Sequence, residues 1–100
     1  MRTFLYFKDY QNIAGDDIKA LQFTEESKNA IYSDTKRFGA YVNAEFDNLD
    51  GQPIMELTNQ SDGVKQYVTI GSYVAYTPET EFIVIDKDIF EQNMTLKVFN

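Results

Sequence analysis

The Asp50-Gly51 dipeptide restricts the fold of this chain more than any other local feature. It lies between Tyr41–Asp47, in which apolar and polar residues alternate, and the segment Ile54–Leu57. Both central residues of a type I′ turn have positive φ, which Gly adopts freely and Asp tolerates, so Asp-Gly between such segments is a strong hairpin signal. The sequence therefore predicts an antiparallel hairpin here.

A second hairpin is predicted around Thr77-Pro78. Tyr73–Tyr76 and Glu81–Ile85 are short apolar segments on either side, and proline fits the second position of a type I turn. Further strands are expected at short apolar segments bounded by turn-forming residues, namely Thr3–Phe7, Ile18–Phe23, Val64–Ile70 and Met94–Phe99.

Thr24–Phe38 carries the clearest helix signals. Thr24 can cap the N-terminus, acids follow in the first turn, bases occupy the last turn, and Gly39 stands where the chain must leave with positive φ. A short second helix is predicted to begin after Asp86 and to end near Asn93. Together these elements predict an α+β fold: an antiparallel, hairpin-built sheet with one main helix packed on a face and a short C-terminal helix.

The length and composition indicate one folded domain spanning residues 1–100. One hundred residues leave no room for two separate cores, and a content of 43% hydrophobic and 15% aromatic residues is too high for a disordered chain. The N-terminal residues lack the apolar region of a signal peptide, and no stretch approaches the roughly 20 apolar residues that cross a bilayer. We therefore expect a cytoplasmic protein that does not engage a membrane.

Acidic residues dominate the charge. Sixteen Asp and Glu against nine Lys and Arg give a formal net charge of −7 at pH 7. Such a charge opposes non-specific attraction to the phosphates of a nucleic acid. We therefore expect no direct nucleic-acid ligand.

The chain has neither cysteine nor histidine. Their absence removes disulfides, thiol redox pairs, zinc sites built on Cys or His, and nucleophilic catalysis with a His base. The acid-rich stretch Glu79–Glu91 does not replace them as a cation loop, because Ile83–Ile85 occupy its middle and no Gly is present. We predict that the protein is not an enzyme and has no catalytic residues, cofactor or metal.

Four residues near the second hairpin are candidates for binding a partner protein: Tyr73, Tyr76, Glu79 and Glu81. One interpretation is that the two tyrosines pack across strands with their hydroxyls reaching water. The alternative is an exposed patch, because Tyr is enriched at the centres of protein interfaces.

A second set of acids suggests a different binding mode. Asp34, Glu45, Asp47 and Asp50 could form one negative face that imitates a nucleic-acid backbone. Such a face would present charge to the basic groove of a host DNA-handling or defence protein. Ordinary solvation of a hairpin explains the same acids without any partner.

The C-terminal half resembles a family of small uncharacterised bacteriophage and prophage proteins. Val68–Val74 and Glu81–Glu91 are similar to the end of that family, which reads Pro-Gly-Asp-aromatic-Ile, then Gly-Glu-Phe, then Asp-Ile-Phe-Glu. Ile18–Thr24 resembles its opening strand, whereas Ile70 and Ser72 replace the usual proline and aspartate. The resemblance implies an origin in a bacteriophage or prophage, action in the cytoplasm of the bacterial host, and no catalytic residues.

Two functional hypotheses follow. The first is a non-enzymatic phage accessory protein that binds another protein, such as a host bacterial protein, or itself as a homo-oligomer through an exposed strand edge or aromatic patch. The alternative is an acidic nucleic-acid mimic that inhibits a host DNA-handling or defence protein.

Overall fold

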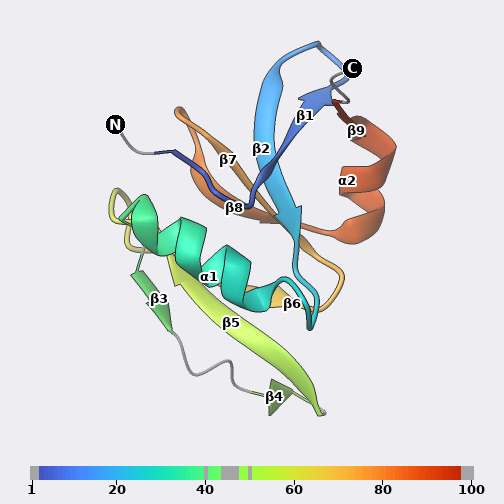
Figure 1. Cartoon of the computed structure of the whole chain (residues 1–100). Coiled ribbons are helices and arrows are strands. Elements are labelled where there is room, and N and C mark those ends of the chain that lie inside the picture. Colours follow the sequence, from blue (N-terminus) through green and yellow to red (C-terminus); the bar gives the residue numbers. More distant parts are fainter. Residues whose placement is uncertain (1–2, 40, 44–47, 50, 98–100) are drawn as a thin grey trace.

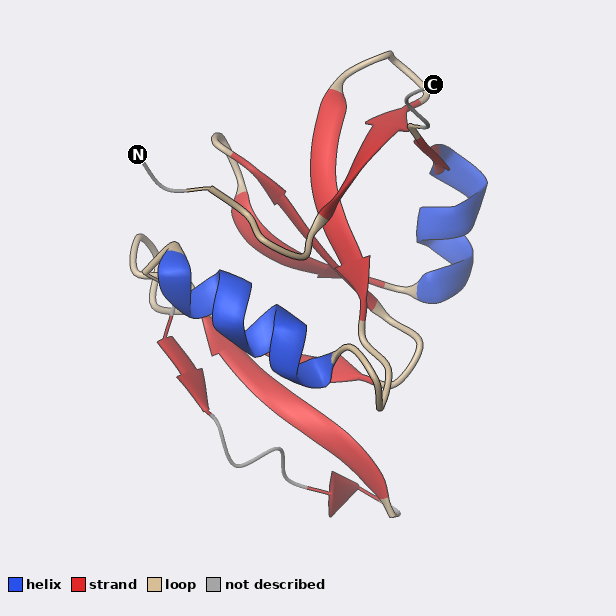
Figure 2. Ribbon diagram, viewed as in Figure 1, coloured by secondary structure: helices blue, strands red, loops and turns tan. Residues whose placement is uncertain are grey.

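Antiparallel strands form two sheets in the computed structural model, which describes residues 3–39, 41–43, 48–49 and 51–97 (Figures 1 and 2). The strands of the first sheet lie in the order β8-β7-β2-β1-β9. Their bounds are Lys8–Asn12 for β1, Asp17–Gln22 for β2, Tyr73–Thr77 for β7, Glu81–Ile85 for β8 and Met94–Leu96 for β9. The predicted hairpin around Thr77-Pro78 is confirmed as the antiparallel pair β7–β8.

The second sheet is built around β5. Its strands are β3 (Tyr41–Asn43), β4 (Asn48–Leu49), β5 (Gln52–Thr58) and β6 (Lys65–Thr69), and β5 pairs with all three others. The hairpin predicted at Asp50-Gly51 is confirmed: Leu49 pairs with Gln52 across two intervening residues, and Gly51 has a φ of 79°. Residues 44–47 of the predicted alternating strand lie outside the described residues.

The two helices confirm the predicted α+β fold. Helix α1 (Lys28–Arg37) lies across the second sheet, and α2 (Lys87–Asn93) lies on another side of the molecule, with Asp86 at its N-cap position (Figure 1). Gly39 has the expected positive φ of 84° after α1. No helix in the described part of the chain is long and apolar enough to cross a bilayer.

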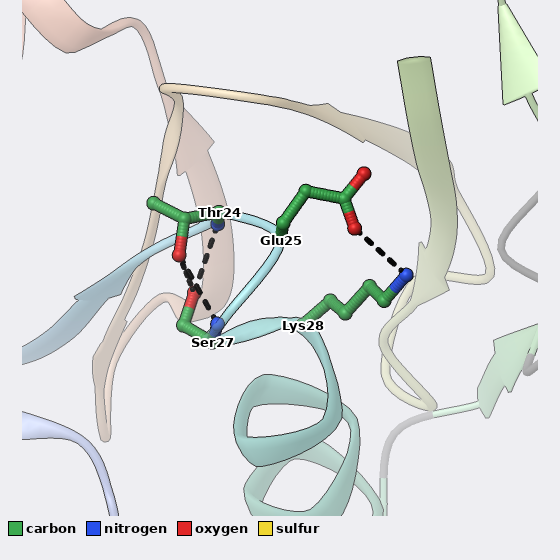
Figure 3. A network of polar contacts seen from close by, with 4 residues as sticks. All are labelled: Thr24, Glu25, Ser27 and Lys28. Carbon is green, nitrogen blue, oxygen red and sulfur yellow. Dashed lines mark hydrogen bonds and ion pairs between the residues drawn. The ribbon is translucent and has the colours of Figure 1, made fainter. Parts of the chain in front are cut away.

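Helix α1 begins three residues later than the sequence predicted, because its N-cap residue is Ser27 and not Thr24. The Thr24 amide donates to Ser27 Oγ at 2.9 Å, and the Ser27 amide donates back to Thr24 Oγ1 at 3.1 Å (Figure 3). This reciprocal pair of hydrogen bonds resembles a capping box, but it closes a turn that precedes the helix. Lys28 Nζ adds an ion pair to Glu25 at 3.0 Å. Thr24 therefore caps the turn, and Ser27 is the N-cap residue.

Both faces of the first sheet are buried. In β7, Val74 and Tyr76 face one side whereas Tyr73 and Ala75 face the other, as the two-residue period of a strand requires. One face joins α1 and the second sheet in a core made of Phe7, Phe23, Ile31, Met55, Leu57, Val68, Val74 and Phe82. The other face packs under α2 in a smaller core made of Ile18, Ala20, Tyr73, Ala75 and Phe90. The first sheet is thus the middle layer.

The predicted strand Thr3–Phe7 is wrong. This segment is irregular, and the first strand begins at Lys8. The backbone amides of three consecutive residues, Leu5, Tyr6 and Phe7, donate to the carboxylate of Asp34 on α1 at 3.0, 2.7 and 2.9 Å. A carboxylate can satisfy several backbone donors at once, so the segment needs no partner strand.

The outer edge of β8 is closed by two side-chain amides. Asn59 donates to the Phe82 carbonyl at 2.6 Å and accepts from the Phe82 amide at 3.1 Å. Gln66 of β6 donates to the same carbonyl at 2.9 Å and accepts from the Val84 amide at 3.0 Å. These four hydrogen bonds take the place of a neighbouring strand and join β8 to the second sheet.

Candidate functional site

Two adjoining hollows lie at one rim of the first sheet, where β2 begins and β7 ends. Their volumes are about 410 and 450 Å³, and they share Asp17, Ile18 and Pro78 in their linings. Both volumes fall within the range of about 300–1,000 Å³ that is usual for ligand pockets. We call the two hollows together the rim groove.

Strand pairing explains why the rim groove forms here. Lys19 of β2 pairs with Tyr76 of β7. Because the two strands are antiparallel, the residue before Lys19 and the residue after Tyr76 lie side by side at the rim. Pro78 has no backbone N–H and ends the ladder on the β7 side. The turns between β1 and β2 and between β7 and β8 consequently flank the same space.

Three aromatic rings form one end of the rim groove. The rings of Phe4 and Phe38 stack with centroids 4.0 Å apart, and the Tyr76 ring lies 5.2 Å from Phe4 and 5.1 Å from Phe38. All three side chains are partly exposed and line the hollow of about 410 Å³. Because Asp34 holds the segment that carries Phe4, this end is fixed in place.

Carboxylates form the other end. Asp16, Asp17 and Glu79 line it, and Asp9 lies beside the aromatic end. Lys19 forms an ion pair with Asp9, and Lys97 forms one with Asp17 at 2.9 Å. Asp16 and Glu79 belong to none of the ion pairs of the described residues. The groove therefore carries excess negative charge.

The structure brings together three of the four residues predicted to bind a partner. Tyr76 and Glu79 line the rim groove. Glu81 lies nearby, in a smaller polar hollow of about 170 Å³ that Tyr76 also lines. Glu81 has a φ of 56°, a left-handed conformation that costs a non-glycine residue about 1–2 kcal/mol, and its carboxylate accepts a hydrogen bond from the Ser61 hydroxyl.

Tyr73 does not belong to this site, which corrects its assignment to the partner-binding set. It is 7% exposed and lies on the opposite face of the sheet, where its ring stacks on Phe90 at 3.9 Å. Its hydroxyl donates to Glu91 at 2.9 Å. Tyr73 and Tyr76 are three positions apart in one strand, and this odd spacing puts them on different faces.

One of the four acids predicted to form the acidic face of a nucleic-acid mimic is not at the surface. Asp34 is 0% exposed and bonded to three backbone amides, so it cannot present charge to a partner. Glu45, Asp47 and Asp50 lie outside the described residues. The described residues thus give no support to that face.

Sequence reasoning missed most of the residues that line the rim groove, above all Phe4, Phe38 and the Asp16-Asp17 pair. The pair follows Gly15 directly, which marked it as part of a turn but not as part of a site. Only the pairing of β2 with β7, about fifty residues later in the chain, shows that this turn faces Glu79.

Tyr73, Glu91 and Lys87 form a separate polar cluster beside α2. Burial, then the hydrogen bond to Glu91, raise the pKa of Tyr73 to about 12. The hydrogen bond between Lys87 and Glu91, 3.1 Å long, raises the pKa of Lys87 and lowers that of Glu91. Each shift stabilises the form present at neutral pH, whereas a nucleophile or general base needs the opposite shift. The cluster has the properties of a structural contact.

The raised pKa of Tyr73 predicts a loss of stability in alkali. Between pH 10 and about 12 the unfolded chain releases this proton and the folded chain keeps it, so the free energy of unfolding falls as pH rises. We expect the fall to be roughly 2–3 kcal/mol smaller in Tyr73→Phe, measured by urea unfolding across this window.

The matched control is Tyr67→Phe, because the Tyr67 ring is 56% exposed on β6. Equal pH slopes for Tyr73→Phe and the unchanged protein would contradict the assignment of this titration to Tyr73.

No group of three or more acids in the described ranges is arranged to hold a metal ion. Comparison with known proteins finds no matching family model, no matching curated protein and no matching solved structure. The fold places the chain in the α+β class, and the rim groove is a candidate binding site lined by described residues.

Proposed function

We propose that this chain is a non-enzymatic bacteriophage or prophage accessory protein that acts by binding another protein in the bacterial cytoplasm. The resemblance of Val68–Val74 and Glu81–Glu91 to phage and prophage proteins supports the origin. The rim groove supports the mode of action. The observation that carries the proposal is the combination of a fixed aromatic end and an excess of carboxylates in one groove.

This combination suits a protein partner. A few residues carry most of the binding energy of a protein interface, aromatic residues are enriched among them, and a polar rim surrounds them. Leu5 and Tyr6, which follow Phe4 in the chain, are 58% and 51% exposed and add further apolar surface on the same segment. Since Asp34 already holds this segment, a partner would not lose affinity by ordering it.

Self-association through the edge of β8 is disfavoured. Phe82 and Val84 direct their outward backbone groups to Asn59 and Gln66, so another strand would have to displace these amides. An aromatic contact at the rim groove is a route to a homo-oligomer that leaves the amides in place.

The test is capture of host proteins from a bacterial lysate by immobilised protein, followed by mass spectrometry. The groove variant Asp16→Lys/Glu79→Lys reverses the charge of two exposed residues that take part in none of the ion pairs of the described residues. The control variant Glu26→Lys/Asp88→Lys makes the same change at exposed positions outside the groove. We expect at least one host protein to be captured by the unchanged protein and by the control variant but not by the groove variant.

Equal capture by the groove variant and the control would remove the rim groove from the proposal. Chemical turnover by the purified protein, abolished when one carboxylate is neutralised, would overturn its non-enzymatic character.

A further inference from the structure

We infer that the rim groove receives an arginine-bearing, basic segment of the partner. This inference rests on the proposed function and names the chemistry of what binds. The aliphatic stem and guanidinium of the arginine lie against Phe4, Phe38 and Tyr76, and its charge is met by Asp17, which lines both hollows. A neighbouring basic residue of the segment meets Glu79 at the acidic end.

Charge complementarity selects a cationic occupant. The lining of the groove holds four carboxylates, Asp9, Asp16, Asp17 and Glu79, against the single ammonium of Lys19. Lys19 is engaged by Asp9, which leaves the acidic end without a cation from the lining itself. The ion pair between Lys97 and Asp17 involves a carboxylate that is 71% exposed, so an incoming cation can compete for it at low cost.

The aromatic end selects arginine among cationic side chains. A guanidinium is planar, stacks on aromatic rings and binds carboxylates through two parallel hydrogen bonds, whereas an ammonium is a strongly hydrated point charge. Cations are also attracted to the face of an aromatic ring, which carries the negative part of its quadrupole. In the rim groove rings and carboxylates share one lining through Phe4, Tyr76 and Asp17.

The size of the groove indicates that more than one residue of the partner enters. The two hollows meet at Asp17, Ile18 and Pro78, and each is large enough by itself for a small ligand. A short extended segment can therefore place one side chain at the aromatic end and a neighbouring basic residue at the acidic end.

The test uses an acetylated and amidated tri-arginine peptide as probe, titrated into the isotopically labelled protein and followed by NMR. We expect the largest shifts at the amides of Asp17, Tyr76 and Glu79. The same peptide with citrulline, which keeps the shape and loses the charge, should bind about tenfold more weakly.

Variants locate the binding. Asp17→Asn/Glu79→Gln should weaken the tri-arginine peptide about tenfold, and the matched control Glu26→Gln/Asp88→Asn should change the affinity less than twofold. Equal weakening by the two variants would show non-specific attraction to an acidic protein and would overturn the inference. Equal affinity for the citrulline peptide would do the same.

The outcomes also separate this inference from the proposed function. A captured partner that depends on the groove, together with a tri-arginine peptide that causes no shifts there, leaves protein binding intact and rejects the arginine-bearing segment. Loss of groove-dependent capture rejects the proposed function itself.

Discussion

Replacing Asp34 with alanine is expected to lower the free energy of unfolding by about 3 kcal/mol, because hydrogen bonds to a charged group and buried donors left unpaired each cost 1 kcal/mol or more. The substitution leaves the amides of Leu5, Tyr6 and Phe7 without their acceptor. Urea unfolding followed by circular dichroism measures the loss. The exchange of the Phe7 amide proton with solvent should become faster as well.

Two further variants make this prediction specific. Asp34→Asn keeps the shape and one acceptor oxygen, so its loss should be smaller than that of the alanine variant. Ser33→Ala, at the neighbouring half-buried position of α1, should change stability by less than about 0.5 kcal/mol. A loss below about 1 kcal/mol in Asp34→Ala would contradict the view that this carboxylate holds the N-terminal segment.

Replacing Asn59 with leucine is expected to destabilise the protein by about 2–3 kcal/mol, since it leaves the buried N–H and C=O of Phe82 with fewer partners. Asn59 is 3% exposed, so water cannot replace its amide without opening the structure. Urea unfolding gives the loss, and hydrogen exchange at the Phe82 amide reports it locally.

Gln66 provides the companion measurement. Gln66→Met removes the bonds to Phe82 and Val84 and should accelerate exchange at the Val84 amide. Because Asn59 and Gln66 share the Phe82 carbonyl, we expect the stability loss of the double variant to differ from the sum of the two single losses. Gln92→Met, exposed on α2, is the matched control. Unchanged exchange at Val84 in Gln66→Met would contradict the closed edge.

Local signals predicted most of the fold. The two hairpins and the end of α1 follow from Asp-Gly, Thr-Pro and Gly39, each of which acts within a few residues. The first strand failed for the opposite reason. Thr3–Phe7 has a strand-like composition, but its amides bind a carboxylate 27–29 residues away, and no pattern within the segment encodes that contact.

The candidate site was predicted in part. Tyr76 and Glu79 lie beside a turn that the sequence marks clearly, and turns often carry binding residues. The grouping of Tyr73 with Tyr76 does not hold, because spacing along a strand decides which face a side chain occupies. Phe4 and Asp17 could not be found, since their place in the groove depends on the order of strands in the sheet.

The middle position of the first sheet has a consequence for how such a protein diverges. Its central strands have cores on both sides, so few of their positions tolerate exchange during evolution. The rim groove draws much of its lining from turns and strand ends, where sequence change disturbs packing least. On the proposed function, exchange of Asp16 or Glu79 would therefore change what the groove binds while the same scaffold persists.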